Sequence, residues 1–353
     1  MSRVFKTIGT HSGTFHCDEA LAIAMLRILD NFKDAEIIRS RDLNVLSQLD
    51  ILVDVGNEYI PETFRFDHHQ RGFTETFSPK HTIKLSSAGL VYKHFGKEII
   101  AKITNTHDSE TIDLLHKKIY SSFVEAIDAI DNGVSQYPAD LEPAYASSTD
   151  LGARVGRLNP DWNETCTDDE LLVRFLKASE ITGAEFVDAV HHVVKSWLPA
   201  RNICVEAFRS RFEPNDVDAN PTGEYIVFKE FCPWKDHFFQ AQAEEDENVA
   251  KGMAIEPEQS LHNVKYVIYE AQGQWRYLAI PIHKTSFLSR LPFPETWRGL
   301  RDADLEAACG VEGATFVHHS GFTGGCKTKA GLIKMIKLAL AEGSHVDKKA
   351  RME

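Results

Sequence analysis

The residues with the clearest chemical potential are an acid and two histidines in the stretch "FDHHQRGF". Asp67, His68 and His69 directly follow "TFRF", which reads as a short strand. Adjacent imidazoles are poor core material, because each buried ring nitrogen needs a partner. In isolation, a polar turn with a chance pair of histidines explains the stretch equally well. The rest of the chain must decide between a turn and a reactive site.

Further imidazoles and carboxylates follow neighbouring predicted strands in the first half. They are His11, His16 and Asp18 in "THSGTFHCDEA", Asp54 after "DILV", and Asp128 and Asp131 in "AIDAIDNG". Histidine with aspartate suits divalent cations such as Mn²⁺, Mg²⁺, Co²⁺ or Zn²⁺. The donors outnumber the needs of one ion, so we expect two ions that share a bridging carboxylate. Two-metal sites of this kind promote phosphoryl chemistry.

Each of these residues also has an ordinary structural explanation. His11 could cap a turn, Asp18 could be a helix N-cap, and Asp54 could satisfy an amide at a strand end. Of the two acids in "AIDAIDNG", we expect Asp131 to face the metal, because the helix ends there, and Asp128 to support it from behind. The joint pattern at successive strand ends favours a metal site over these separate explanations.

The first half of the chain alternates strands and helices, and this order must position the polar residues. Strands are expected at "VFKTIGT", "AEIIRS", "DILVDVG" and "TFRF". Helices are expected at "DEALAIAMLRIL", at "LNVLSQL", around 86–97 and over 108–130. Alternation predicts an α/β fold with a parallel sheet, which binds ligands beyond the carboxyl ends of its strands.

The second half has a different character. We expect a helical stretch from about 168 to 211, broken near "WLPAR", and then a loop at "EPNDVDANPTG". Strands follow at "EYIVFKE", "VKYVIYEA" and "WRYLAIPI", with little helix between them. A helix at "DLEAACG", a strand at "ATFVHHSG" and a terminal helix at "KTKAGLIKMIKLALAEG" follow. We expect a catalytic domain with a helical connector at 1–197, a smaller mixed α/β domain at 198–345 and a frayed tail at 346–353.

Composition limits the class of protein. A chain of 353 residues with 43% hydrophobic content suffices for two domains, and a net charge of −13 argues against general coating of nucleic acid. Six cysteines without a C-x-x-C pair predict reduced thiols of an intracellular protein. Cys17 could bind a soft metal, but the neighbouring ligands are harder. No apolar run reaches the roughly 20 residues of a membrane span, and the N-terminal strand leaves no room for a secretory signal. We expect the nucleus or cytoplasm, with the mitochondrion as an alternative.

The sequence blocks resemble those of a known family. Asp67-His68-His69 is the signature of the DHH phosphoesterase superfamily, and the closer resemblance is to the melanocyte-proliferating-gene (MYG) exonuclease family. The blocks that carry it are "GTHSGTFHCDEALA", "ILVDVG", "FDHHQRGF", "SRLPFPETWRGLR" and "FVHHSGFTGG". The resemblance implies a DHH-type N-terminal domain and a second domain, with the active site in the cleft between them. It also implies a divalent-metal-dependent 3′-to-5′ exoribonuclease of the nucleus and mitochondria.

The resemblance assigns a role to each polar residue of the first half. Asp67 matches a supporting acid and His69 a group that faces the substrate phosphate, which makes these two the candidate catalytic residues. His16 stands where the superfamily usually has aspartate, which favours Mn²⁺ first, and Co²⁺ or Zn²⁺, over Mg²⁺. The matched metal ligands, with Asp54 as the bridge between two cations, are His11, His16, Asp18, Asp54, His68 and Asp131.

Candidate substrate-binding residues lie in the last third. Basic side chains can clamp phosphate, and a glycine-rich turn that enters a helix can offer it free N–H groups. The candidates are Arg290, Arg298, Arg301, His318, His319, Gly324, Gly325 and Lys327. The turn resembles the Gly-Gly-His turn of the DHH-associated domain, with Cys326 in the histidine position. The ordinary alternatives are a solvated basic face and, for the neighbouring Trp297, core packing rather than stacking on a base.

The expected function is 3′-to-5′ hydrolysis of single-stranded RNA, with no membrane partner. A small-molecule phosphohydrolase for pyrophosphate or short nucleotides would share the metal site and differ in the second domain. A non-catalytic, metal-dependent RNA-binding protein is a third hypothesis. The oligomeric state is not readable from the sequence, although exposed strand edges in the last third would allow a homodimer.

Overall fold

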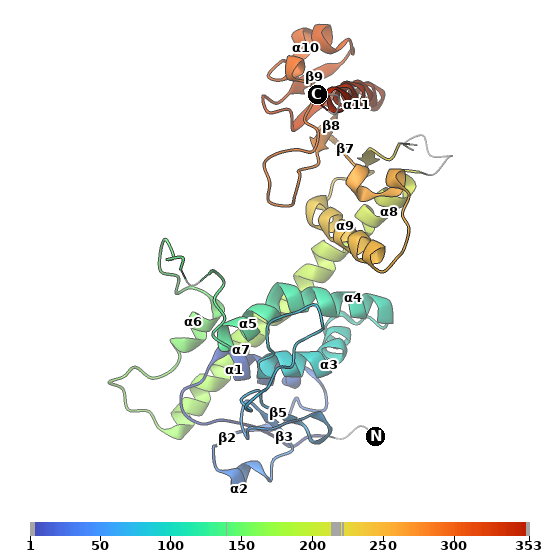
Figure 1. The fold of residues 1–353 in the computed structure, drawn as a ribbon. Helices are drawn as coiled ribbons and strands as arrows, with labels where there is room; N and C mark the ends of the chain where they lie inside the picture. Colours follow the sequence, from blue (N-terminus) through green and yellow to red (C-terminus); the bar gives the residue numbers. More distant parts are fainter. Residues whose placement is uncertain (1–3, 139, 213–219, 221, 351–353) are drawn as a thin grey trace. The chain divides into compact units, whose positions relative to one another are not determined.

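Figure 1 shows the computed structural model of the chain, which describes residues 4–138, 140–212, 220 and 222–350. The chain divides into two compact units, Met1–Lys195 and Ser196–Glu353. Each unit has its own five-stranded sheet, so the fold is mixed α/β. The expected domain boundaries stay a prediction.

The first unit is built on a sheet of order β2-β1-β3-β5-β4. Its strands are β1 (Thr7–Thr10), β2 (Glu36–Arg39), β3 (Ile51–Val53), β4 (Tyr59–Ile60) and β5 (Arg65–Phe66). Strands β1, β2, β3 and β5 are parallel, as expected. The sheet is nevertheless mixed, because β4, which was not predicted, joins β5 antiparallel through one 3-10 turn (Pro61–Thr63), too short for a parallel crossover.

Helices cover both faces of this sheet. They are α1 (Cys17–Ile28), α2 (Leu43–Leu46), α3 (Ser87–Thr104), α4 (Ser109–Ile119), α5 (Glu125–Asp131), α6 (Leu151–Gly156) and α7 (Asp168–His192). Helices α1, α3 and α7 pack against one another on one side of the strands, and α2 lies on the other side (Figure 1). Helix α1 is buried almost all round from Cys17 to Leu26, which makes it the central helix of the unit.

Two segments of π-helix interrupt the helical stretches. One, Tyr120–Val124, joins α4 to α5 within the helix expected over 108–130. The other, Val193–Trp197, joins α7 to α8 (Leu198–Ser210), so the expected break near "WLPAR" is a change of winding within continuous helix. Most of the loop expected at 213–223 lies outside the described residues.

The second unit has a sheet of order β6-β7-β8-β10-β9. Its strands are β6 (Tyr225–Val227), β7 (Tyr266–Ala271), β8 (Gln274–Ala279), β9 (Ala314–Val317) and β10 (Thr323–Cys326). Strand β6 runs parallel to β7, and the other pairings are antiparallel. Alternate side chains point to opposite faces. Tyr225 and Ile268 belong to the cluster with α10 (Asp302–Cys309) and α11 (Lys329–Ala350), and Ile226 and Val267 to the cluster with α8 and α9 (Trp234–Ala250).

The structure corrects the expectations for this unit in three places. Helix α9 was missed, because its polar sequence "WKDHFFQAQAEEDENVA" carries little apolar periodicity. Gly324 and Gly325 belong to β10, a strand paired on both sides, and not to a turn that enters a helix. Helix α11 continues through residues 346–350, which were expected to fray, while 351–353 lie outside the described residues. No helix among the described residues has the length and apolar character needed to cross a membrane.

Candidate metal centre

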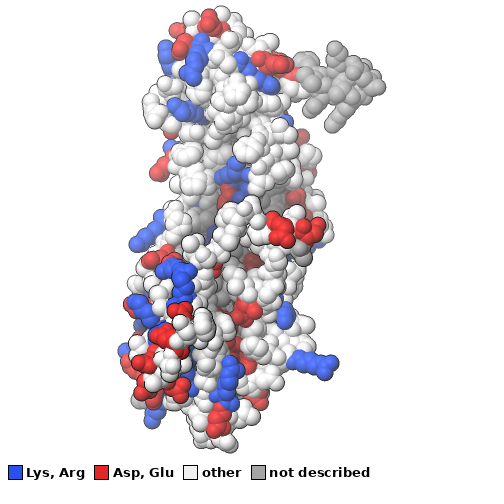
Figure 2. Space-filling view, turned by 90° about the vertical axis from the view of Figure 1, so that its left-hand side faces the viewer, with Lys and Arg blue, Asp and Glu red and all other residues white. Residues whose placement is uncertain are grey.

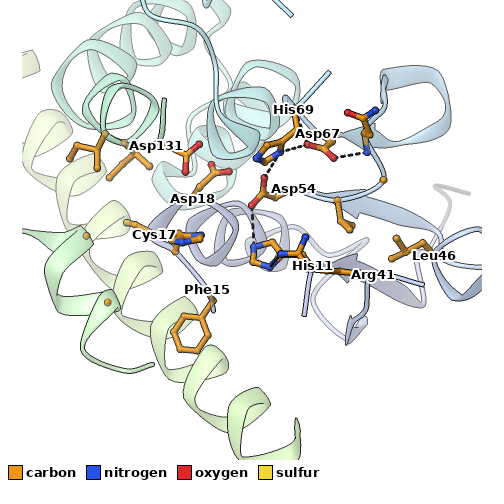
Figure 3. A pocket seen from close by; sticks show the side chains of 18 of the residues that line it. His11, Phe15, Cys17, Asp18, Arg41, Leu46, Asp54, Asp67, His69 and Asp131 are labelled. Atoms are coloured by element: carbon orange, nitrogen blue, oxygen red, sulfur yellow. Dashed lines mark hydrogen bonds and ion pairs between the residues drawn. The ribbon is translucent and has the colours of Figure 1, made fainter. Parts of the chain in front are cut away.

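Polar side chains from the first unit converge at the carboxyl ends of β1, β3 and β5, where a parallel sheet places its ligands. His11 follows β1, Asp54 follows β3 and His68 follows β5, while α1 supplies Asp18 and α5 supplies Asp131. A cavity of about 900 Å³ opens at this edge, and Figure 3 shows the side chains that line it. The strand order therefore accounts for their proximity, although they are up to 120 residues apart in the chain.

Asp54 lies at the centre of the group, between His11 and His69 (Figure 3). Its Oδ2 is 3.4 Å from His11 Nε2, and its Oδ1 is 3.6 Å from His68 Nε2 and 3.4 Å from His69 Nδ1. Ser87 Oγ donates to the same Oδ1 at 3.3 Å. The backbone of Asp54 is left-handed, with φ of 55°, a conformation that non-glycine residues adopt mainly at turns and functional sites. The two oxygens thus face different histidines, as a bridging carboxylate requires.

One donor group consists of His11, His16 and Glu19, whose ligand atoms lie within 4.8 Å of one another. Glu19 Oε1 is 2.9 Å from His11 Nε2 and accepts the backbone N–H of His16 at 2.9 Å. Glu19 was not selected from the sequence. The available signal was a glutamate three residues after the N-cap His16, which is the capping-box position and suggests only a structural role.

A second donor group consists of Asp18, His68 and Asp131, again within 4.8 Å. His68 Nε2 is 3.1 Å from Asp131 Oδ2. The carboxylate of Asp18 accepts the N–H groups of Ser87 at 3.1 Å and Ala88 at 2.5 Å, in the first turn of α3. The start of α3 therefore fixes the orientation of Asp18, and its partial positive charge favours the carboxylate there.

Asp67 and His69 form a pair beside these donors. His69 Nδ1 donates to Asp67 Oδ1 at 2.7 Å, and the backbone N–H groups of Asn57 and His69 donate to the same carboxylate at 2.6 Å and 3.1 Å. Asp67 thus orients His69, whose side chain is 62% exposed and lines the cavity. The geometry agrees with a supporting acid and a histidine that faces substrate, which remain predicted roles.

Asp128 points away from the cavity. Its carboxyl group accepts hydrogen bonds from Ser86 N at 2.9 Å, Ser86 Oγ at 2.7 Å and Tyr120 Oη at 2.8 Å. Gly89 packs against the same group, and a Cβ there would come within 2.2 Å of Asp128 Oδ1. Asp128 therefore anchors the start of α3 to α5, and in this way supports the helix end that holds Asp18.

The charged side chains of the centre strongly shift one another's pKa values. Burial would lower the pKa of His11, but its hydrogen bonds to Asp54 and Glu19 outweigh burial and raise it to about 10. Burial would also lower the pKa of His68, but its hydrogen bonds to Asp131 and Asp54 outweigh burial and raise this pKa to about 10. The same histidines hold the pKa of Asp54 well below its usual value against burial. Burial and the neighbouring Asp131 and Asp54 raise the pKa of Asp18.

The donors fit divalent cations. Histidine nitrogens and carboxylate oxygens are the ligands that Mn²⁺, Co²⁺ and Zn²⁺ accept. One buried ligand atom, Glu19 Oε2, has no hydrogen-bond partner among the described residues. Since buried polar atoms are nearly always satisfied, such an atom in a cluster of acids indicates a missing positive partner. A bound cation would supply it.

Two further side chains line the cavity. Arg41 donates from Nε to Ser12 O at 3.1 Å, and its Nη2 lies 3.1 Å from His11 Nδ1. Arg41 is the only lysine or arginine among the described residues that line the cavity. Arg41 was not selected from the sequence, because it follows β2 without a recognisable motif. Cys17 also lines the cavity, where burial and Asp18 raise the pKa of its thiol to about 12.

The predicted substrate-binding residues all lie in the second unit, and several have structural partners. Arg290 donates to the carbonyl oxygens of Leu261 at 2.9 Å and Val264 at 3.2 Å and to Gln242 Oε1 at 2.7 Å. Arg298 Nε donates to Phe293 O at 2.8 Å. These arginines hold loops together, which leaves less of each guanidinium for phosphate.

The remaining candidates of the second unit are more accessible or belong to the sheet. Arg301, His319 and Lys327 are exposed, and His318 Nδ1 contacts Ser320 Oγ at 2.9 Å. Gly324 and Gly325 are buried in β10, where a Cβ on Gly324 would approach Phe316 O to 2.4 Å, so close packing explains them. Trp297 is buried against Phe293, which confirms packing rather than exposure to a base. The roles of the exposed residues in substrate binding stay a prediction.

Figure 2 shows how charge is distributed on one face of the molecule. Lys and Arg side chains occur there singly or in small groups among Asp and Glu side chains. The mixture of both signs on this face agrees with the net charge of −13.

Comparisons with known proteins place nearly the whole chain in one family. The MYG1_exonuc family model, described as "Uncharacterised protein family (UPF0160)", matches residues 7–340. The MYG1 protein of Dictyostelium discoideum is 46% identical over 330 residues, which cover 93% of this chain and 94% of the relative. The MYG1 exonuclease of Mus musculus is 46% identical over 95% of this chain and 85% of its own length, and that of Homo sapiens 45% identical over 96% and 87%.

A solved structure gives a much weaker match. RecJ from Thermus thermophilus, in complex with Mn²⁺, is 13% identical with a TM-score of 0.24, and the match covers 95% of this chain and 52% of RecJ. The chain thus spans about half the length of that protein. A likeness at this level carries no argument about the site.

Proposed function

Since this chain belongs to the MYG1 exonuclease family, as its sequence blocks predicted, we propose that it is a metal-dependent phosphodiesterase that shortens single-stranded RNA from the 3′ end. The mammalian relatives that carry the name exonuclease align with nearly the whole chain. A nuclease is the coarser part of the proposal, and RNA as substrate and the direction of attack are the finer parts.

The position of Asp54 is the observation that supports the proposal most. One carboxylate oxygen faces the group with His11, and the other faces the group with His68. Two-metal phosphodiesterases need a shared ligand of this kind between two sets of donors. The left-handed backbone of Asp54, at the end of β3, holds the carboxylate between the two groups.

The chain's own residues suit the hydrolysis of a phosphodiester. His11 and His16 would hold one cation, Asp18, His68 and Asp131 the other, and Asp54 both. Bound divalent cations supply Lewis acidity, which activates water for attack and offsets charge on phosphate oxygens. His69, oriented by Asp67, is placed to donate a hydrogen bond to a non-bridging oxygen of the substrate. Arg41 is placed to bind a phosphate from the other side of His11.

The cavity walls suit a nucleotide. Leu43, Leu46 and Val55 form an apolar wall beside Arg41, and Ile127 and Ile130 line the cavity as well. Apolar walls with a few charged groups can hold a base and its phosphate together. We assign recognition of the rest of the RNA to the exposed Arg301, His319 and Lys327 of the second unit.

The test is a nuclease assay on the purified chain. Single-stranded RNA labelled at the 5′ end is incubated with Mn²⁺, with Mg²⁺ and with EDTA. We expect a ladder that shortens from the 3′ end with Mn²⁺ and intact RNA with EDTA. Release of labelled mononucleotide from the 5′ end would reverse the direction, and DNA degraded in preference to RNA would change the substrate.

The cavity volume favours one second candidate, a small-molecule phosphohydrolase. About 900 Å³ is within the range of pockets that enclose a drug-sized ligand, so a pyrophosphate or short nucleotide would fit. Rapid hydrolysis of a dinucleotide that a long RNA does not inhibit would favour this candidate. Strong inhibition by the long RNA would favour the exonuclease.

A further inference from the structure

The donors of the metal centre form two groups with different chemistry. His11, His16 and Glu19 offer two imidazole nitrogens and one carboxylate, whereas His68, Asp18 and Asp131 offer one nitrogen and two carboxylates. Nitrogen-rich sets favour Zn²⁺ and Co²⁺, and oxygen-rich sets favour Mg²⁺ and Mn²⁺. Asp54 faces both groups and would add one carboxylate to each, so the first group stays richer in nitrogen than the second.

The environment of Glu19 carries the inference. Glu19 is 0% exposed, and its Oε2 is buried without a hydrogen-bond partner among the described residues. Its Oε1 is 2.9 Å from His11 Nε2. Burial of a carboxylate is unfavourable unless its oxygens are paired, and His11 pairs only with Oε1, which leaves Oε2 free to bind a cation.

Helix capping explains only part of this arrangement. The N–H of His16 donates to Glu19 Oε1, which satisfies a free amide at the start of α1. Glutamine would serve this purpose equally well, without a buried charge. Capping also leaves Oε2 without a partner, whereas a cation beside His11 and His16 would pair with the carboxylate.

We propose that the two metal positions are unequal, and that Glu19 completes a nitrogen-rich position with His11 and His16 that selects Zn²⁺ or Co²⁺. The position formed by Asp18, His68 and Asp131 takes Mn²⁺ or Mg²⁺. This inference rests on the proposed function for the existence of a two-metal centre. It adds the identity of a ligand and the selectivity of each position.

Titration of the metal-free, full-length chain with Co²⁺ tests the proposal. Visible absorbance and calorimetry follow binding to the wild type, Glu19→Gln and Asp131→Asn, with Glu98→Gln as an acid-to-amide control at an exposed position of α3 that does not line the cavity. In the wild type, we expect the first equivalent to bind at least about tenfold more tightly than the second. Since even partners of metal ligands affect affinity by about 10–100-fold, Glu19→Gln should weaken the first equivalent at least about tenfold and spare the second.

The variants separate the possible outcomes. Asp131→Asn should weaken the second equivalent, and Glu98→Gln should change neither. Circular dichroism verifies that each variant is folded. Two equivalents of equal affinity in the wild type, or a folded Glu19→Gln variant with both affinities unchanged, would overturn the proposal.

The nuclease assay distinguishes a failure of this proposal from a failure of the proposed function. Hydrolysis of RNA together with unchanged Co²⁺ affinities in Glu19→Gln leaves the nuclease intact and refutes the unequal positions. Unequal Co²⁺ binding together with intact RNA and DNA supports the unequal positions and refutes the nuclease.

Discussion

The chain contains two pairs of adjacent histidines at strand ends, and their surroundings differ. His68 and His69 follow β5, with ring centroids 4.4 Å apart, and His318 and His319 follow β9, with centroids 4.1 Å apart. His68 is 7% exposed and lies 3.1 Å from Asp131 and 3.6 Å from Asp54. His318 instead contacts the hydroxyl of Ser320 and the ring of Phe322. The same dipeptide therefore has acidic neighbours in one unit and neutral ones in the other.

Sheet topology explains the difference. Parallel strands end at one edge, so β1, β3 and β5 bring residues from distant parts of the chain to His68. Strands β9 and β10 are antiparallel and joined by a short turn, so the neighbours of His318 come from the same few residues. A His-His pair gains metal-binding potential only where other elements add carboxylates.

The largest expected effect is that of Asp54→Asn. Asparagine tolerates the left-handed backbone of this position, so the variant should fold. Loss of the shared charge should lower kcat/KM at least about 100-fold, because changes to partners of metal ligands already cost about 10–100-fold. Turnover and metal content are measured on the same preparation, and full activity with normal metal content would contradict the account.

The comparison between the two histidine pairs is tested by His68→Ala and His318→Ala. We expect His68→Ala to lose at least about tenfold in metal affinity and in kcat, because it removes a ligand. His318→Ala should keep the wild-type metal content and affect mainly the KM for RNA. Metal analysis and steady-state kinetics give both values, and loss of metal in the His318 variant would reverse the comparison.

A smaller effect is expected for Arg41. Arg41→Ala should raise the KM for RNA by about 10- to 100-fold with little change in kcat, since loss of one charge-assisted hydrogen bond costs about 1.5–3 kcal/mol. Arg41→Lys should restore part of the loss. Arg27→Ala, an exposed arginine of α1 remote from the cavity lining, is the matched control. A change in kcat alone would place Arg41 in the chemical step.

The smallest effect concerns stability and Asp128. Burial raises the pKa of Asp128 from 3.8 to about 7 in the folded chain. An acid with a raised pKa contributes stability below its unfolded pKa and loses it as pH rises through the folded one. The Tm of the wild type should therefore fall relative to that of Asp128→Asn between about pH 4 and pH 7, by about 2–4 °C per kcal/mol. Parallel melting curves across this range would show that Asp128 stays ionised.

Much of the centre was predictable because strand order places strand-end residues together. The positions of His11, Asp54 and His68 follow from parallel strands at β1, β3 and β5. Glu19 and Arg41 were not predictable in the same way. The capping-box position of Glu19 explains it without a metal, and only the folded chain shows its unpartnered oxygen.

The second unit was harder to predict for physical reasons. The sequence of α9 has little apolar periodicity, so the helix is stabilised mainly by packing against the rest of the unit. Gly324 and Gly325 suggested a phosphate-binding turn, but they allow β9 and β8 to approach β10 closely. Glycine signals close approach in both cases, and sequence alone does not distinguish a ligand from a neighbouring strand.

The most direct test compares the wild type and Asp54→Asn on 5′-labelled single-stranded RNA, with Mn²⁺ and with EDTA. The account predicts a ladder shortening from the 3′ end only for the wild type with Mn²⁺, and intact RNA in the other three reactions. Equal shortening by the variant, or by the wild type in EDTA, would contradict a centre in which Asp54 joins two cations.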